Sequence, residues 1–195
     1  MGSGKNGTFD IHPDLNQWAT LFTAEDISVQ APPFIYNYFR FFHCDVKEFL
    51  LQPVEGHGLW DKRKVFGELR QQINDDVAVA VLTRATVKLN RLKNFWSNVD
   101  SVADKISSAK GLIISYGIGE MPWIKQATFT IWQNKNVMKD FAYNMQQHKE
   151  VINKTRNENW YKEEMFVRFR ILSIKGFPEN VAAKMLTLQS AYEEA

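Results

Sequence analysis

The sequence predicts an α+β protein made of two ferredoxin-like repeats, the first one incomplete at its N-terminus, arranged as the α/β barrel that a homodimer usually builds. Two observations carry this prediction. Hydrophobic periodicity over residues 77–176 gives the order strand, helix, strand, strand, helix, strand, which is the ferredoxin-like order. Residues 1–58 repeat part of that pattern. The polar residues 59–76 connect the repeats, and a tail over 177–195 ends in a predicted short helix.

The complete repeat opens with a strand and a helix. Residues 77–89 are rich in β-branched side chains and turn polar on alternate positions from Thr83, as in a strand whose first half is buried on both faces. Residues 90–107 place apolar side chains at helical spacing, and we expect Asn90 to cap that helix. The connection between strand and helix is therefore short.

A hairpin and the second helix follow. The β-rich runs 112–119 and 126–132 are joined by a short turn that contains Pro122, outside both strands. Residues 134 to about 156 form a helix whose apolar face includes His148. The other members of that face are Met138, Phe141, Met145 and Ile152.

The last strand of the repeat, EMFVRFRIL, alternates strictly from Phe166. Arg168 and Arg170 share a face with Phe166, and the opposite face is apolar. A row of partly buried cations must find anions, because an unpaired buried charge is costly. A carboxylate-bearing cofactor would satisfy the row, and so would Glu120, Glu163 or Glu164.

The first repeat is recognised by short similarities. Gly2-Ser3-Gly4 parallels Gly117-Ile118-Gly119, and QWATLFT at 17–23 parallels KQATFTI at 125–131, which predicts a strand over 17–23. A helix over 33–43 and a closing strand over 47–58 follow. That strand ends on Gly58 as the later one ends on Gly176.

The first repeat lacks its opening strand, its first helix and most of its second strand, because Met1 falls where that strand should end. In this fold the opening strand lies in the middle of its sheet, so its absence leaves unpaired edges. We therefore expect in-frame coding sequence upstream of Met1 that specifies a strand and an amphipathic helix.

Composition and charge exclude several classes of protein. Lys and Arg total 24 against 22 for Asp and Glu, so the net charge of +2 gives no field for nucleic acid. Cys44 is the single cysteine, which excludes disulfide scaffolds, Cys-rich zinc sites and iron–sulfur clusters. No secretory signal and no run of about 18 apolar residues is visible, which predicts a cytoplasmic protein.

His148 is the candidate metal ligand. An imidazole on the apolar face of a helix beside a sheet is one geometry that presents an axial ligand to noncovalent haem, although such a residue is more often a satisfied core histidine. Arg156 lies eight residues further on, about 12 Å along the helix, at the reach of a haem propionate. Arg168 and Arg170 are the alternative propionate contacts.

Other reactive or aromatic residues favour structural roles. Cys44 is formally available as a thiolate ligand, but a buried small residue is the simpler interpretation. Three further histidines are expected on the surface or at helix ends: His12, His43 and His57. The aromatic run around Arg40 would line a hydrophobic tunnel or belong to a helix packed in the interior. It comprises Phe34, Tyr36, Tyr38, Phe39, Phe41 and Phe42.

Residues 80–172 contain seven segments in a fixed order: LTRATVKL, FWSNV, GIGEMPW, QATFTIW, DFAYNMQQH, RNENWYKEE and VRFRIL. In their order and spacing these segments resemble the spheroidene monooxygenase family, the carotenoid 2-ketolases. Upstream, GSGKNGTF, the strand WATLFT and HGLWDKRKVF are similar more loosely. The matching positions are Gly117, Gly119, Glu120, Pro122, Trp123, Gln126, His148, Arg156, Trp160, Glu163, Arg168 and Arg170.

The resemblance implies a haem-containing oxygenase that oxidises C-2 of an acyclic carotenoid to a ketone, with O2 and reduced ferredoxin. Two hydroxylations at one carbon followed by dehydration would give that product. Such an enzyme would contact a membrane peripherally, because its polyene substrate dissolves there. The alternative is a haem-free α/β-barrel protein that binds or organises other molecules without catalysis.

Overall fold

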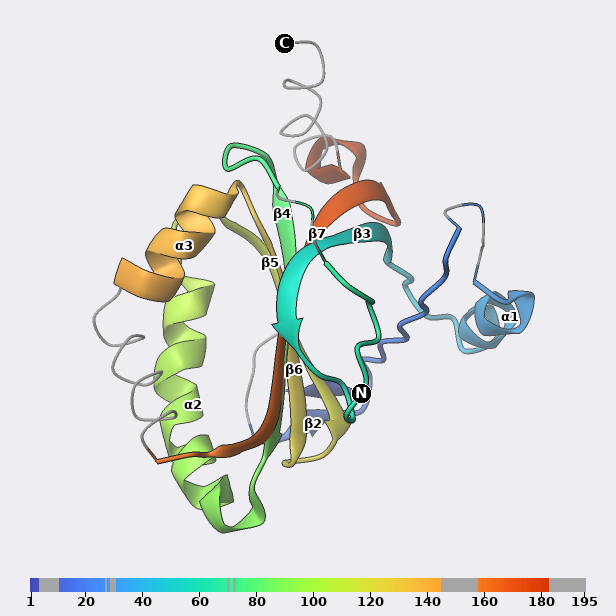
Figure 1. Cartoon of the computed structure of the whole chain (residues 1–195). Coiled ribbons are helices and arrows are strands. Elements are labelled where there is room, and N and C mark those ends of the chain that lie inside the picture. The colour runs from blue at the N-terminus through green and yellow to red at the C-terminus, as the bar shows by residue number, and fades with distance from the viewer. Residues whose placement is uncertain are drawn as a thin grey trace.

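The computed structural model describes residues 1–3, 11–26, 28, 31–69, 71, 73–144 and 158–182. Over these residues the chain forms one antiparallel sheet of seven strands, with α2 and α3 against one face (Figure 1). The mixed α/β class predicted from the sequence is therefore confirmed. The elements are β1 Gly2–Ser3, β2 Pro13–Asp14, α1 Pro33–Phe41, β3 Glu48–Gly58, β4 Val79–Val87, η2 Leu89–Arg91, α2 Leu92–Ser107, β5 Leu112–Met121, β6 Lys125–Trp132, α3 Lys135–Asn144 and β7 Tyr161–Lys175.

The sheet order is β2-β1-β5-β6-β4-β7-β3, and every neighbouring pair is antiparallel. β4 lies between β6 and β7 and is buried on both faces, which explains its run of β-branched and small residues. β5 and β6 form the predicted hairpin, and Pro122 lies in the turn outside both strands. Among the described residues, no helix is long and apolar enough to cross a membrane.

The predicted cap at Asn90 is wrong. Asn90 lies inside the 3₁₀ turn η2, and α2 begins after Arg91, whose side chain makes no capping hydrogen bond. The chain leaves β4 through this turn, in which the N–H of Arg91 donates to the carbonyl of Lys88 at 2.8 Å. The turn places Asn90 two residues ahead of the helix, so its side chain is not at the position that caps.

The two faces of the sheet bury separate apolar clusters. On the helix side, Val79 and Val81 of β4 pack with Met138 and Phe141 of α3, as the predicted helix face requires. On the opposite side, which we call the inner face, β4 contributes Ala80 and Leu82. The neighbouring strands add Phe129, Ile131, Val167 and Phe169 to it. The connection over 59–69 covers this inner face with Trp60, Val65, Phe66 and Leu69.

The pairing of β3 with β7 has a two-fold pattern. When β3 and β7 are aligned by Gly58 and Gly176, every pair in the ladder except the terminal one, Gly58 with Met165, has its exchanged counterpart. Glu48 pairs with Lys175 as His57 pairs with Phe166, and the central pair, Gln52 with Arg170, maps onto itself. Both glycines have positive φ, 91° and 81°, which a residue with a Cβ adopts only with strain.

The N-terminal region is the part that departs from the sequence prediction. β1 joins the edge of β5, with Gly2 opposite Ile118. Residues 17–23 form no strand and are mostly exposed, because no neighbouring strand is present in the described chain to pair with them. The helix predicted over 33–43 is present as α1, but none of its residues is buried, so its packing in the interior is wrong.

Candidate functional site

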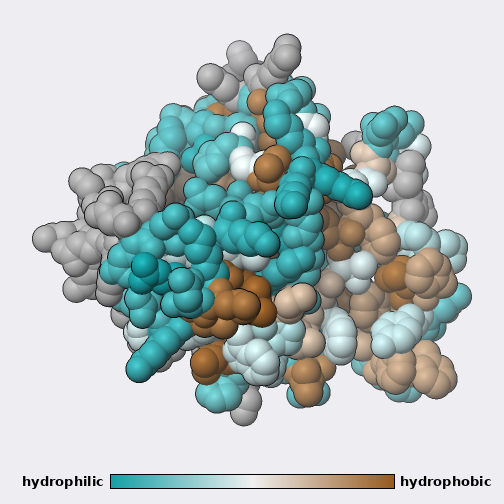
Figure 2. Space-filling view, turned by 60° about the horizontal axis from the view of Figure 1, so that its bottom comes forward, coloured by the Kyte–Doolittle hydropathy of each residue, from teal (hydrophilic) through white to brown (hydrophobic). Residues whose placement is uncertain are grey.

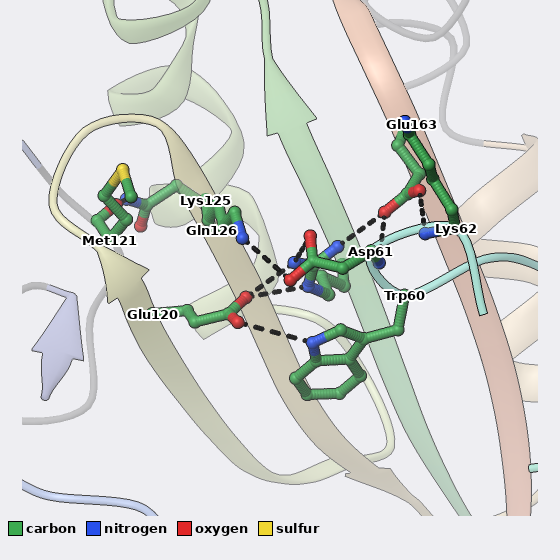
Figure 3. A network of polar contacts seen from close by, with 9 residues as sticks. Trp60, Asp61, Lys62, Glu120, Met121, Lys125, Gln126 and Glu163 are labelled. Atoms are coloured by element: carbon green, nitrogen blue, oxygen red, sulfur yellow. Dashed lines mark hydrogen bonds and ion pairs between the residues drawn. The ribbon is translucent and has the colours of Figure 1, made fainter. Parts of the chain in front are cut away.

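A buried arginine marks the inner face of the sheet. Arg84 continues the row of Ala80 and Leu82 on β4, and its side chain is 1% exposed. A guanidinium is never deprotonated at ordinary pH, so its burial requires anionic partners. Three carboxylates supply them, from the connection, from β5 and from β7 (Figure 3).

All three guanidinium nitrogens of Arg84 are used. Nε and one terminal nitrogen donate to Glu120 Oε2 at 2.9 and 2.7 Å. The terminal nitrogen that binds Glu120 also donates to Asp61 Oδ1 at 3.0 Å, and the other terminal nitrogen donates to Glu163 Oε1 at 2.9 Å. The ring of Trp60 lies over the guanidinium, 4.8 Å from its central carbon. Four of the five N–H donors of Arg84 are therefore used within this cluster.

The same cluster fastens the connection to the sheet. Glu163 accepts the backbone N–H groups of Asp61 and Lys62 at 2.7 Å each, and Lys125 of β6 donates to Asp61 Oδ2 at 2.8 Å. Trp60 Nε1 donates to Glu120 Oε1 at 3.3 Å. These bonds, all drawn in Figure 3, hold the segment that packs Phe66 and Leu69 against the inner face.

Electrostatics keep the cluster ionised. The hydrogen bond from Lys125, opposed by burial and reinforced by Arg84, holds the pKa of Asp61 below its usual value. Burial alone would raise the pKa of Glu163, but the two backbone N–H groups and Arg84 outweigh it and leave that pKa lowered. Burial would lower the pKa of Arg84, yet its hydrogen bonds to Glu120 and Asp61 raise it.

A second polar pair lies where β1 meets the hairpin. The hydroxyl of Ser3 donates to Gln126 Oε1 at 2.8 Å, and both side chains are buried. They border a small cavity of about 10 Å³, close to the space of one water molecule, together with Trp96 and Gly119. Trp123 closes this region from the turn and donates through Nε1 to the carbonyl of Ile11 at 3.1 Å.

Arg168 lies on the other face of the sheet. Its side chain donates to Glu55 Oε2 at 2.9 Å and lies over the ring of Phe166. Lys135 pairs with the second oxygen of Glu55 at 2.7 Å, and burial of that carboxylate is outweighed by the two cations, which lower its pKa. Arg168 Nε is buried and has no hydrogen-bond partner in the described chain.

The sequence predictions for site residues have different outcomes. Arg168 and Arg170 share a strand face as predicted; Arg170 is exposed, and the anion that Arg168 finds is Glu55. Glu120 and Glu163, expected as alternative partners of that row, bind Arg84 instead. His148 and Arg156 lie outside the described residues.

The remaining sequence predictions concern the other histidines and the single cysteine. His12, His43 and His57 are exposed as expected. Cys44 is also exposed, so its interpretation as a buried residue is wrong. It follows α1, in which no residue is buried. Within the described residues no group of three or more His, Cys, Asp or Glu could hold a metal ion.

Arg84 itself was not identified from the sequence. The available signal was a charged residue in the middle of a strand otherwise composed of buried residue types. Such a residue requires a buried counter-charge, and Asp61, Glu120 and Glu163 are too distant in the chain for spacing alone to reveal it.

Comparisons with known proteins define the class. Spheroidene monooxygenase of Rhodobacter capsulatus is 30% identical over 202 residues, covering 97% of this chain and 82% of that protein. The spheroidene monooxygenase of Cereibacter sphaeroides is 33% identical over 183 residues, 90% of this chain. This chain spans 56% of the length of that relative. No family profile matches the sequence.

These similarities place the protein among monooxygenases. The chain belongs to the spheroidene monooxygenase family. Solved structures are more distant. A monooxygenase-like protein of Listeria innocua superposes with a TM-score of 0.37 at 11% identity, over 75% of this chain and 88% of its own. A conserved protein of Methanosarcina mazei gives 0.42 at 15% identity, over 49% and 94%.

Proposed function

We propose that this protein is a carotenoid monooxygenase that oxidises C-2 of an acyclic carotenoid to a ketone. The observation that carries the proposal is the 30% identity to the Rhodobacter capsulatus enzyme, which extends over 97% of this chain. The motifs shared with the family include GIGEMPW, which covers the end of β5 and the turn after it, and Glu120 of that motif is one of the three carboxylates bound to Arg84.

The proposed reaction replaces a methylene group by a carbonyl. Two molecules of O2, four electrons and four protons give one ketone and three molecules of water. Each hydroxylation places one oxygen atom on carbon and reduces the other to water, and the resulting gem-diol loses the third water. Reduced ferredoxin is the proposed electron donor.

Noncovalent haem is the proposed cofactor, and it would supply the activation of O2. We assign His148 as its axial ligand, with Arg156, Arg168 or Arg170 at a propionate. Two features of the described chain support the arginine assignment. Arg168 and α3 lie on the same face of the sheet, and the buried Nε of Arg168 lacks a described partner. Such a nitrogen needs a hydrogen-bond acceptor, and a carboxylate oxygen makes the strongest bond to it.

The haem assignment is tested by absorbance. His148→Ala is expected to abolish the Soret band of the purified protein while its far-ultraviolet circular dichroism stays nearly unchanged. His57→Ala is the matched control, because His57 is exposed on β3, and it should keep the band. A full Soret band in His148→Ala would transfer the ligand role to another residue. No band in the unmodified protein would favour the haem-free binding protein.

We also propose that residues 77–176 are one complete ferredoxin-like repeat and that residues 1–58 are the incomplete first repeat of a barrel-like architecture. The strand order β5-β6-β4-β7 with α2 and α3 on one face supports the first part. The two-fold register of β3 with β7 supports the second. By the same symmetry, the free edge of β3 would take a strand equivalent to β4.

The activity is tested in cells that accumulate an acyclic carotenoid. Expression of this chain is expected to yield a carotenoid that has gained one oxygen and lost two hydrogens, identified by chromatography and mass spectrometry. His148→Ala is the inactive control. Unchanged carotenoid in cells that contain folded, haem-loaded protein would contradict the proposed function.

A further inference from the structure

At one end of the sheet, the end of β4, the β5–β6 turn and the start of β7 lie side by side. The N–H of Val87, the last residue of β4, donates to the carbonyl of Ile124 in the β5–β6 turn at 2.8 Å. The next N–H, of Lys88, donates to the carbonyl of Trp160 just before β7 at 2.9 Å. The η2 turn, the hairpin turn and the start of β7 therefore form one continuous surface.

This surface exposes large apolar side chains. Leu89 is 71% exposed, Met121 46% and Trp123 51%. A groove of about 560 Å³ runs between the elements and is lined by Val87, Leu89 and Ile124 together with polar residues. Figure 2, in which this end comes forward, shows brown apolar surface bordered by teal hydrophilic side chains. Exposed apolar side chains that gather in one patch rimmed by polar residues mark an interaction site, whereas scattered ones do not.

The charged side chains that line the groove are all lysines. Among the described residues, Lys88, Lys93 and Lys162 form no ion pair, and Lys88 and Lys162 line the groove. Lys125 also lines it and is bound to Asp61, while Arg91 faces Glu158 at 3.9 Å. Glu158 accepts from Asn94 and Trp160, and the other carboxylates nearby are Glu164 and the three bound to Arg84, namely Asp61, Glu120 and Glu163.

The other exposed apolar region has the opposite charge balance. Residues 11–46 expose Leu15, Trp18, Phe34 and Phe41, among others. The described part of that segment holds one basic side chain of the Lys or Arg type, Arg40, and four acidic ones. The acidic residues are Asp14, Glu25, Asp26 and Asp45. Anionic headgroups would be repelled there, whereas they would be attracted by the lysines around Leu89.

We propose that the surface formed by Lys88, Leu89, Met121, Trp123 and Lys162 docks this protein on an anionic lipid bilayer. Apolar side chains on loops enter the headgroup region, lysines pair with lipid phosphates, and a tryptophan lies at the interface. The inference rests on the proposed function in one respect. An acyclic carotenoid dissolves in the bilayer, so the groove beside Leu89 faces the phase that holds the substrate.

The test is cosedimentation of the purified chain with vesicles. Binding is expected to vesicles of phosphatidylcholine with phosphatidylglycerol, to weaken at high salt, and to be weak with phosphatidylcholine alone. Leu89→Ser should reduce the partition coefficient about tenfold, and Lys88→Gln or Lys162→Gln about fivefold each. Leu15→Ser and Lys110→Gln are matched controls at exposed positions elsewhere and should bind normally. Urea unfolding verifies that each variant is folded.

Three results would overturn the proposal. These are absence of binding by the unmodified chain, equal binding to both kinds of vesicle, and a loss with Leu15→Ser as large as that with Leu89→Ser. Carotenoid conversion in detergent micelles separates this proposal from the proposed function, because micelles remove the need for docking. No conversion in micelles contradicts the function, whereas conversion in micelles by a protein that does not bind vesicles contradicts only the docking.

Discussion

Arg84 organises the inner face of the sheet at the scale of single residues. Its side chain is 1% exposed and its partners come from three separate parts of the chain, of which Glu163 is 14% exposed and Asp61 49%. The buried cation is therefore neutralised by carboxylates that reach toward solvent. This arrangement costs less than burying all the charges, and it fixes the connection over the apolar core.

Replacing the arginine should be costly. Arg84→Met is expected to lower the free energy of unfolding by about 3 kcal/mol, since it leaves three adjacent carboxylates without their common partner. Urea denaturation measures this loss. Arg91→Met is the matched control: Arg91 is 38% exposed and faces Glu158 at 3.9 Å, so its loss should cost less than about 1 kcal/mol. Equal costs for both variants would contradict the role given to Arg84.

Acid should destabilise the protein through the same carboxylates. The pKa values of Asp61, Glu163 and Glu55 are lower in the folded state than their usual values, so the unfolded chain binds more protons at acid pH. The stability that these three carboxylates contribute is fully present above their pKa values in the unfolded chain, which are about 4. It is lost as the pH falls through their lower pKa values in the folded protein. Urea midpoints measured from pH 6 to about 3 should fall, and less steeply in Glu163→Gln. A parallel fall in that variant would exclude Glu163 as a contributor.

The pairing of β3 with β7 determines the architecture at the scale of elements. Gly58 is the last residue of β3 and lies against Glu164 and Met165 of β7. Gly176 directly follows β7 and lies against Val46 and Lys47, the two residues before β3. A Cβ on Gly58 would lie 2.1 Å from the carbonyl oxygen of Glu164, and one on Gly176 would lie 2.1 Å from that of Val46. At each end of the β3–β7 ladder, a glycine with positive φ therefore packs directly against the backbone of the opposite segment.

This symmetry predicts matched effects of substitution. Gly58→Ala and Gly176→Ala should each lower the free energy of unfolding by more than about 3 kcal/mol, because the positive φ and the contact with backbone add. Gly67→Ala is the control, since Gly67 has φ +67° but nothing within 4 Å of its Cβ position. It should cost only about 1–2 kcal/mol. A tolerated Gly176→Ala beside a disruptive Gly58→Ala would contradict the two-fold relation.

Exposed aromatic surface dominates the N-terminal third at the scale of the whole molecule. Trp18 is 60% exposed and Phe41 77%, on segments that belong to no strand among the described residues. Exposed apolar surface promotes association between copies. Trp18→Ser with Phe41→Ser should therefore reduce self-association, seen by sedimentation velocity, without lowering the urea midpoint. A lower midpoint would show that these side chains already pack in the monomer.

Elements that depend on local interactions were predicted correctly from the sequence, whereas features that depend on distant parts of the chain were not. β4, the hairpin β5–β6, α3 and β7 were predicted because each has its own period and local neighbours. The strand over 17–23 was not correct, because a strand needs a partner that its own sequence does not contain. Arg84 was missed for the same reason: its carboxylates are brought together only by the tertiary fold.

The central claim is oxygenation of an acyclic carotenoid, and isotope labelling tests it most directly. Purified haem-loaded protein is incubated with spheroidene, reduced ferredoxin and isotopically heavy O2, and the product is extracted rapidly into a dry solvent. The proposed reaction predicts a C-2 ketone that carries the heavy oxygen, because both hydroxyl oxygens of the gem-diol come from O2. A ketone whose oxygen comes only from water under this rapid extraction, or recovery of spheroidene unchanged, would contradict the claim.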